Sequence, residues 1–340
     1  MLLREMKITH IFTFSRYLTF TLSSTFLYNI DYIAALKLDI GLCGLGKHQT
    51  EDEITCLKPK TVANFRQDAG YYDENFALVN DGVGGWEQLG VDSRFYSANL
   101  TELLSMNRKF CEPVRKIRKR WNRAYDVMKS RMIEGSTTVL EANYCLKTRI
   151  LTVATLGDAK LVIFRKNLSK VSMSRDSTSQ KMSSDSNSSS KSQNSNFGFS
   201  KVYSSIPQAY SFNFPYQLSS RDDEIFRGGV SATVIDQIKL KKGDIIVMGS
   251  DGIWDNLYEK TVLNRISKNH LEIISEIYSE NSLNTSKNFA KHLVKQARLY
   301  SNLRHICSPF CEKCVKAGYL RSRCLGGKLD DSTVAVIFVK

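Results

Sequence analysis

The chain has 340 residues, of which 42% are hydrophobic, and a formal net charge of +14 at pH 7. This length and composition can bury one large core, and short motifs spread from end to end favour one domain over two. The positive charge would suit an acidic partner, but nucleic-acid binding is not expected, because the sequence has no zinc-finger spacing, RNA-binding signature or interleaved aromatic and basic strand.

The N-terminal segment, residues 1–30, is rich in Ser, Thr, Phe and Leu, and Glu5 is its one acidic residue. A basic, hydroxyl-rich and acid-poor composition is typical of a mitochondrial transit peptide, whereas the uncharged run 17–30 could be the apolar part of a secretory signal. That run is shorter than the roughly 20 residues of a membrane span. We therefore expect a targeting segment or a disordered N-terminus over 1–30, one domain over 31–340, and no stable membrane insertion.

Acidic residues border several predicted strands. Apolar runs predict strands over 76–80, 150–154, 244–248 and 333–339, and the acids beside them are Asp81, Asp158, Asp251 and Asp330. Alternation along the first strand places Asp81 on the face of Ala77 and Val79, just before the turn at Gly82. Single Asp-Gly pairs are usually turns, but several acids at strand ends, with Asp68 upstream, predict a metal site.

Three further stretches have apolar residues at roughly helical spacing, namely 92–134, 261–280 and 286–300. The first of them carries a basic cluster that consists of Arg115, Lys116, Arg118, Lys119, Arg120 and Arg123. We interpret this cluster as a solvated helix face. A docking surface for acidic protein or phospholipid is the alternative.

A serine-rich segment, 169–196, has no apolar period and follows a strand predicted over 161–164. Such a segment cannot bury enough apolar surface to offset its conformational entropy, so we expect it to be disordered. Since motifs resume beyond it, we interpret it as an insertion within the domain. A regulatory loop with phosphorylation sites is the alternative to simple low-complexity expansion.

The eight cysteines lack the spacing of a disulfide framework, and none is expected in a chain of this size. Four of them are crowded near the C-terminus and could supply a structural zinc site: Cys307, Cys311, Cys314 and Cys324. Their spacing fits no standard zinc module. We therefore favour reduced thiols without metal and keep a zinc- or redox-linked protein as an alternative.

Taken in order, the motifs resemble those of the metal-dependent type 2C protein serine/threonine phosphatases. They are Asp68-Ala69, the turn DGVGGW at 81–86, GSTT at 135–138, LGD at 156–158, SDG at 250–252 with Asp255-Asn256, and GGKLDDST at 326–333. The first turn, the segment 212–218 and Ser308-Pro309-Phe310 are similar to the T-cell-activation-type branch, which is often mitochondrial and has plant and fungal members. The resemblance covers about 36–340.

This resemblance implies an α+β fold, a four-layer α-β-β-α sandwich of two antiparallel sheets flanked by helices. It implies a phosphatase that hydrolyses phosphoserine and phosphothreonine in phosphoprotein substrates, with water as the nucleophile. The expected location is the mitochondrial matrix, with the secretory pathway, another organelle or the cytoplasm as alternatives. The sequence does not indicate an oligomeric state.

The resemblance also assigns the site. Carboxylates without nearby Cys or His select Mg²⁺ or Mn²⁺, and two such ions about 4 Å apart can activate a bridging water. By motif position Asp81 bridges both ions, the Gly82 carbonyl binds one, and Asp251 and Asp330 complete the other, so these three aspartates are the catalytic set. Asp158 would hold a third, weaker ion. Asp68 would act beside the ligands or at that third site.

Three positions depart from the family pattern. The usual Glu-Asp pair is Gln67-Asp68, and Val83 stands where better-known relatives have a general-acid histidine. The phosphate-binding arginine has no secure equivalent among Arg66, Lys58 and Lys60. A catalytically impaired relative that binds phosphoproteins is therefore the alternative, although retention of the three catalytic aspartates argues against it.

Overall fold

The computed structural model describes residues 36–106, 108–167, 198–221, 229–268, 285–319 and 326–340. Residues Lys37–Lys340 form one compact unit, and the account below concerns this unit. The expectations for the N-terminal segment and for the serine-rich insertion fall outside the described residues and stay predictions. Among the described residues, no helix combines the length and the apolar character that crossing a membrane requires.

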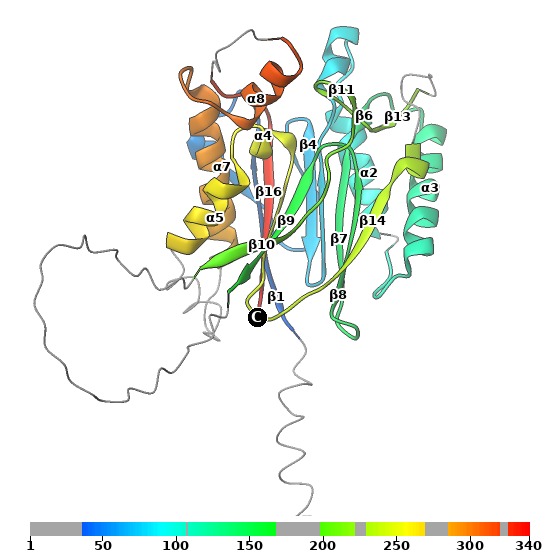
Figure 1. Cartoon of the computed structure of the whole chain (residues 1–340). Coiled ribbons are helices and arrows are strands. Elements are labelled where there is room, and N and C mark those ends of the chain that lie inside the picture. The colour runs from blue at the N-terminus through cyan, green and yellow to red at the C-terminus, as the bar shows by residue number, and fades with distance from the viewer. Residues whose placement is uncertain (1–35, 107, 168–197, 222–228, 269–284, 320–325) are drawn as a thin grey trace, which may run out of the picture. The chain divides into compact units, whose positions relative to one another are not determined.

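Two six-stranded antiparallel sheets form the centre of this unit (Figure 1). Sheet A contains β1 (Leu38–Leu45), β2 (Thr55–Cys56), β9 (Lys160–Lys166), β10 (Phe199–Ser204), β15 (Ile245–Gly249) and β16 (Ser332–Val339). Sheet B contains β3 (Ala63–Phe65), β4 (Asp68–Asp73), β5 (Phe76–Asn80), β7 (Val139–Cys145), β8 (Ile150–Leu156) and β14 (Val234–Lys239). The strand orders are β10-β9-β15-β16-β1-β2 and β14-β8-β7-β5-β4-β3.

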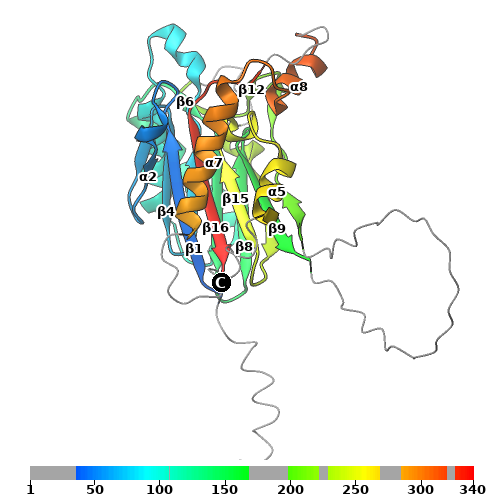
Figure 2. The same cartoon turned by 90° about the vertical axis from the view of Figure 1, so that its left-hand side faces the viewer.

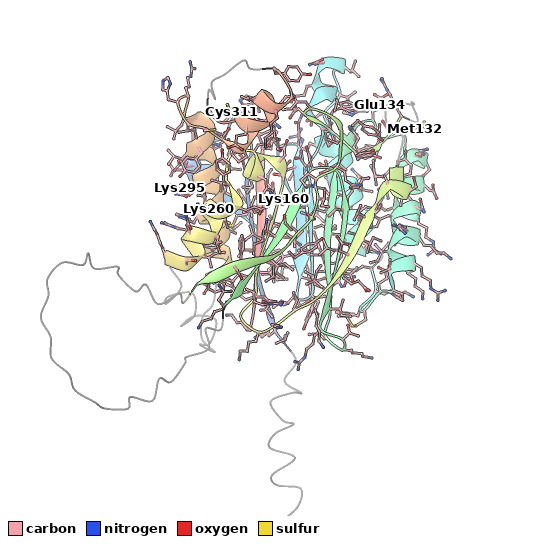
Figure 3. All side chains as sticks on the ribbon, in the orientation of Figure 1. Met132, Glu134, Lys160, Lys260, Lys295 and Cys311 are labelled. Atoms are coloured by element: carbon pink, nitrogen blue, oxygen red, sulfur yellow. A yellow bond between two sulfur atoms is a disulfide. The ribbon has the colours of Figure 1, made fainter. Side chains whose placement is uncertain are left out.

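Helices cover the outer face of each sheet. On sheet A they are α5 (Glu259–Lys268) and α7 (Thr285–Asn302), and Figure 2 shows α7 running along β1 and β16. On sheet B they are α2 (Arg94–Met106) and α3 (Val114–Ser130). Lys260 on α5 and Lys295 on α7 lie on the outer surface (Figure 3). The expected four-layer α-β-β-α sandwich is therefore confirmed.

Shorter elements complete the chain. The short strands are β6 (Ser136–Thr137), β11 (Ala209–Ser211), β12 (Phe214–Pro215) and β13 (Leu218–Ser219). The short α-helices are α4 (Asp251–Trp254) and α8 (Pro309–Lys316), and 3-10 turns span Glu51–Glu53, Gly84–Leu89 and Gly229–Ala232. In Figure 1, α4 and α8 lie near one another at the upper end of sheet A.

Each sheet packs an apolar outer face against its helices. Val336 and Phe338 of β16 pack with Phe289 of α7, and every residue of β16 is buried, as expected of a central strand. On the other side Phe76 of β5 packs with Trp121 of α3. These two clusters hold the helices in place, so the ends of the strands have fixed positions.

Two glycines let the sheets approach one another. A Cβ on Gly44 in β1 would lie 2.3 Å from the ring of Phe65 in β3, and one on Gly70 in β4 would lie 2.9 Å from the side chain of Leu42 in β1. Any larger side chain would collide with the opposite sheet. The spacing between sheets A and B therefore depends on the missing side chains at these positions.

The helices differ in detail from the expectation. The stretch 92–134 is two helices, because Pro113 favours a break and stands as the N-cap of α3. The sequence analysis missed α8, although the Ser308 hydroxyl accepts a hydrogen bond from the N–H of Cys311 and Pro309 occupies the first turn. Ser followed by Pro is a recognised helix start, so this signal was present.

Arg120 corrects the interpretation of the basic cluster as a solvated face. Its side chain is only 4% exposed and donates to Glu112 at 2.9 Å and to Glu141 on β7 at 2.5 Å. The position lies three residues after Ile117 and four before Ala124, both buried, so it shares their helix face. Basic residues in a helical pattern thus include one that is part of the interior.

Four cysteines form two disulfides, although their spacing in the sequence describes no disulfide framework. Cys43 of β1 is bonded to Cys56 of β2, and Cys111, which lies between α2 and α3, is bonded to Cys145 at the end of β7. The partners are 13 and 34 residues apart, so sequence spacing alone did not reveal the pairs. Each bond joins segments that the sheets and helices bring together.

Candidate metal centre

The predicted acidic residues come from both sheets and meet at one end of the sandwich. Asp81 directly follows β5, and Asp158 follows β8 in the same sheet B. Asp251 lies just after β15, and Asp330 lies just before β16, both in sheet A. The strand ends that the sequence predicts are thus confirmed, and they bring carboxylates of two sheets together.

Three of these aspartates form a compact group. One carboxylate oxygen from each of Asp81, Asp158 and Asp251 lies within 4.8 Å of the others. The N–H of Asp251 also donates to Oδ2 of Asp81 at 3.3 Å, which links the two sheets directly. Asp330 lies beside this group, where its carboxylate pairs with Lys328 at 3.0 Å.

The GSTT motif holds the backbone of Asp81. The Thr137 hydroxyl and the Thr138 N–H both donate to the carbonyl oxygen of Asp81, at 2.8 and 2.9 Å. The N–H of Asp81 donates to the Thr138 hydroxyl at 3.2 Å. At Gly82 a Cβ would lie 2.4 Å from the carbonyl oxygen of Gln67, so the turn requires glycine there. The motif therefore fixes where the Asp81 carboxylate leaves the sheet.

Asp331 positions the loops around the group. Its two carboxylate oxygens accept hydrogen bonds from the N–H groups of Lys47 and Gln67, at 2.5 and 2.9 Å. Burial raises the pKa of Asp331 to about 6 despite these bonds. The second aspartate of the pair thus joins the end of β1 and the start of β4 to β16.

Burial dominates the electrostatics of the acidic group. It raises the pKa of Asp158 to about 7 with help from Asp251, and it raises the pKa values of Asp68 and Asp81 well above their usual range. Oδ1 of Asp158 and Oδ2 of Asp68 are buried without a hydrogen-bond partner in the described part of the chain. Unpaired buried carboxylate oxygens are costly, and a divalent cation would supply the missing positive charge.

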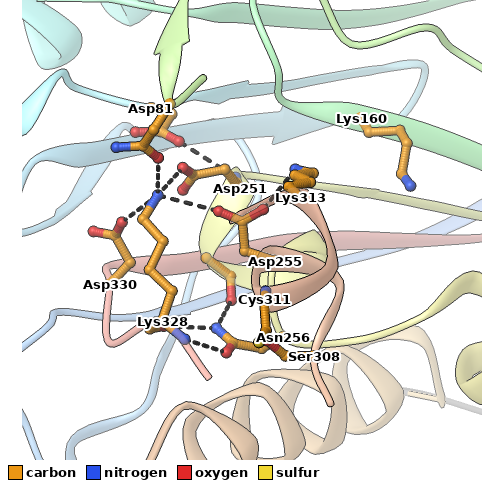
Figure 4. A network of polar contacts seen from close by, with 12 residues as sticks. Asp81, Lys160, Asp251, Asp255, Asn256, Ser308, Cys311, Lys313, Lys328 and Asp330 are labelled. Atoms are coloured by element: carbon orange, nitrogen blue, oxygen red, sulfur yellow. Dashed lines mark hydrogen bonds and ion pairs between the residues drawn. The ribbon is translucent and has the colours of Figure 1, made fainter. Parts of the chain in front are cut away.

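Lys328 is the residue that the sequence analysis missed. Figure 4 shows its ammonium among the carboxylates of Asp251, Asp255 and Asp330. Burial alone would lower the pKa of Lys328, but the three carboxylates outweigh burial and raise it well above its usual value. The sequence signal was a lysine in the glycine-rich turn GGKLDD, and nothing in the pattern says that its side chain points inward.

The departures from the family pattern have structural explanations. The Gln67 side chain donates to Glu87 at 3.0 Å and Arg66 pairs with the same carboxylate at 2.7 Å, so both are directed toward Glu87. Lys60 pairs with Glu74 on the surface. Val83, whose N–H donates to the Ser136 carbonyl at 3.0 Å, offers no side-chain proton.

A cavity of about 420 Å³ adjoins the acidic group, because Asp158 is among its lining residues. Asp255, Phe212, Phe310 and Lys313 also line it. Lys313 pairs with Asp255 at 2.6 Å. The cavity could therefore receive a group next to the carboxylates, against an aromatic and basic wall formed partly by α8.

The cysteine hypothesis is not tested by the structure. Cys311 and Cys314 are buried on α8 and Cys307 is exposed just before it. Cys324 lies outside the described residues, so the four thiols cannot be placed together.

Comparison with known proteins gives consistent relatives, although no family model matches the chain. The chain is 28% identical over 265 residues to a probable protein phosphatase 2C, BIPP2C1, of Oryza sativa subsp. japonica. This match covers 77% of the chain and 37% of the relative. The chain is 26% identical to probable protein phosphatase 2C 26 of Arabidopsis thaliana, and this match covers 82% of the chain and 79% of the relative. The matched part thus spans less than half the length of the rice relative.

A solved structure agrees in sequence and in fold. The photosystem II phosphatase PBCP is 25% identical, superposes with a TM-score of 0.61, and is matched over 89% of this chain and 99% of its own. The similarity therefore includes both sheets and the acidic end between them. By its motifs, its fold and these relatives, the chain is similar to the metal-dependent type 2C (PPM) protein phosphatases.

Proposed function

We propose that this chain is a protein serine/threonine phosphatase that depends on Mg²⁺ or Mn²⁺. The observation that carries the proposal is the group formed by Asp81, Asp158 and Asp251, with an unpaired buried oxygen on Asp158 and another on Asp68. Oxygen ligands of this kind suit hard divalent ions. Two ions, with a third and weaker one at Asp158, follow from the motif assignments.

Each residue has a role in this proposal. Asp81, Asp251 and Asp330, with the Gly82 carbonyl, would hold the ions, and Asp68 and Asp158 would hold or support the additional one. When bound, the ions would neutralise phosphate oxygens and lower the pKa of a water directed at phosphorus. Val83 cannot protonate the leaving group, so that proton would come from a water bound at the site or from solvent.

The cavity beside the acids supports a protein substrate. Its lining combines Phe212 and Phe310 with Lys313, and Lys316 lies farther along the same helix. Aromatic rings and ammonium groups can bind the segment that carries a phosphorylated side chain, which is larger than a simple phosphate ester. We therefore propose phosphoproteins, rather than small phosphate esters, as the substrates.

The test is hydrolysis of phosphoserine and phosphothreonine peptides by the purified full-length chain. Added Mn²⁺ or Mg²⁺ should give phosphate release, and excess EDTA should abolish it. Full activity in EDTA would contradict the proposal. A phosphotyrosine peptide serves as the control for residue specificity.

Lys328 favours a second candidate, a catalytically impaired relative that binds phosphoproteins. Its ammonium already bridges Asp251 and Asp330, which are two of the proposed metal ligands. Such a protein would bind a phosphopeptide without releasing phosphate at any Mn²⁺ concentration. The peptide assay with a parallel binding measurement separates the two candidates.

Branch and location are proposals of their own. The segment 212–218 and Ser308-Pro309-Phe310 support the T-cell-activation-type branch, and the N-terminal composition supports import into the mitochondrial matrix. The bonds Cys43–Cys56 and Cys111–Cys145 are an argument for the secretory alternative, because disulfides persist in oxidising compartments. Fractionation of cells that carry the C-terminally tagged full chain tests this point.

A further inference from the structure

Lys328 makes more contacts than its three N–H donors can satisfy. Its ammonium pairs with Asp251, with Asp255 at 3.1 Å and with Asp330 at 3.0 Å, and it donates to Oδ1 of Asn213 at 3.0 Å. The nitrogen also lies 5.3 Å from the centre of the Phe310 ring. Four oxygen-bearing residues therefore share one ammonium, so individual partners can be released without leaving the charge unpaired.

The backbone of Lys328 is fixed by the fold. Oδ1 of Asn256 accepts from the N–H of Lys328 at 2.9 Å, and Nδ2 of Asn256 donates to the Lys328 carbonyl at 2.8 Å (Figure 4). A Cβ on the preceding Gly327 would lie 2.3 Å from the Tyr300 carbonyl oxygen, so the chain passes close to α7. The lysine thus enters the acidic group from an anchored position.

Two of its partners are the carboxylates assigned to one metal ion. Asp251 and Asp330 would complete the coordination of that ion, and the Lys328 ammonium now stands between them. An ammonium and a divalent ion repel one another at contact distance, so they cannot both hold these carboxylates closely. Asp255 and Asn213 are not assigned as ligands. The ammonium can therefore release Asp251 and Asp330 and still keep two acceptors.

We propose that Lys328 is a tethered cation that stabilises the metal-free site and competes with the divalent ion for Asp251 and Asp330. This inference rests on the proposed metal-dependent function. It assigns to one lysine the control of how tightly the site takes up metal. Removing the ammonium should leave the carboxylates without their positive partner, which weakens the metal-free fold and strengthens metal binding.

The first test measures Mn²⁺ affinity by isothermal titration calorimetry at constant pH. Full-length wild type, Lys328→Met and Lys313→Met are compared, and Lys313 is the matched control because it pairs with Asp255 but has no ion pair with Asp251 or Asp330. We expect Lys328→Met to bind Mn²⁺ about tenfold more tightly or better, since a charge next to the ligands is gone. Lys313→Met should change the affinity by less than about threefold, because that charge is more distant.

The second test is thermal unfolding with and without Mn²⁺. Lys328→Met should unfold at a lower temperature than wild type without metal, and Mn²⁺ should raise its transition by more than it raises that of wild type. Lys328→Gln, which keeps a polar group without the charge, should behave in the same way and serves if the Met variant does not fold.

The outcomes separate this inference from the proposed function. If wild type binds Mn²⁺ and both Lys328 variants bind it equally well or more weakly, the competition is refuted while the phosphatase proposal stands. If wild type binds no Mn²⁺ at all, the proposed function is refuted and the competition with it.

Discussion

Two of the buried ionic clusters in the described part of the chain are built in opposite ways. In the first, Arg120 donates to Glu112, Glu141 and the Leu104 carbonyl, and Trp121 donates to the remaining oxygen of Glu141. Arg120 thus donates through three of its nitrogens, and both carboxylate oxygens of Glu141 accept a hydrogen bond. In the second, at the end of the sandwich, carboxylates outnumber the lysines, and one oxygen each of Asp68 and Asp158 finds no hydrogen-bond partner among the residues that the structure describes.

This difference separates a structural cluster from a functional one. A buried ion pair whose hydrogen bonds are satisfied holds the fold together and has no capacity left for a ligand. The acidic end has more carboxylates than ammonium groups, and the pKa values of Asp81 and Asp158 are raised, which is the pattern expected of a site that binds a cation. Changes in the two clusters should therefore affect different measurements.

The largest effect is expected from Asp81→Asn. Removing the charge that the proposal places between the ions should lower Mn²⁺-dependent turnover by about three orders of magnitude. Asp52→Asn, at an exposed position, is the control and should leave turnover unchanged. Near-normal turnover of Asp81→Asn at saturating Mn²⁺ would show that the assigned ligand is wrong.

In the cluster around Arg120, Glu141→Gln should lower stability rather than turnover. Arg120 would lose one of its two carboxylate partners in the interior, and we expect the free energy of unfolding to fall by about 3 kcal/mol. Urea unfolding measures this loss, with exposed Glu134→Gln as the control. Mn²⁺ affinity of the folded protein should not change. A large change in that affinity would contradict the separation of the two clusters.

The pH dependence of stability should report on the acidic end and not on the cluster around Arg120. The pKa of Asp158 rises from 3.8 to about 7 on folding, and that of Asp331 rises from 3.8 to about 6. Between the ordinary and the raised pKa, each carboxyl therefore binds more protons in the folded chain than in the unfolded chain. The stability of metal-free protein should therefore fall as pH rises from about 4 to 7, by several kcal/mol at about 1.4 kcal/mol per pKa unit. Saturating Mn²⁺ should suppress the fall, and equal curves with and without metal would contradict this assignment.

The smallest effect concerns Gln67→Glu. The family pattern suggests that a glutamate here would add charge beside the metals. The Gln67 side chain, however, donates to Glu87 at 3.0 Å, so a new carboxylate at this position would face the Glu87 carboxylate at about that distance. We expect a loss of about 1 kcal/mol in stability and little change in Mn²⁺ affinity. Glu87→Gln in the same chain should restore the stability, and a loss that persists in the double variant would refute the pairing.

The sequence predicts those parts of the fold that have a local signal. The ends of β5, β8 and β15 and the start of β16 follow from apolar runs bordered by acids and glycines, so the positions of Asp81, Asp158, Asp251 and Asp330 could be anticipated. The sandwich itself came from the family resemblance, because strand order depends on contacts between distant segments.

The features that were missed depend on direction or on pairing in space. A lysine in a glycine-rich turn is normally solvated, whereas here two backbone hydrogen bonds with Asn256 hold Lys328 beside the carboxylates that its ammonium contacts. Arg120 belongs to a basic run and becomes interior through the carboxylate of Glu141 on another strand. The two disulfides likewise join cysteines whose proximity is created by folding.

The contribution of ligands by both sheets has a consequence for the centre of the molecule. Since Asp81 and Asp158 belong to sheet B and Asp251 to sheet A, the distances among their carboxylates depend on how far apart the sheets lie. Gly44 and Gly70 permit that close approach. A methyl group at either position would act as a wedge and shift one wall of the site against the other. Substitutions in the interior, which touch no acid, should therefore behave in assays as active-site mutations.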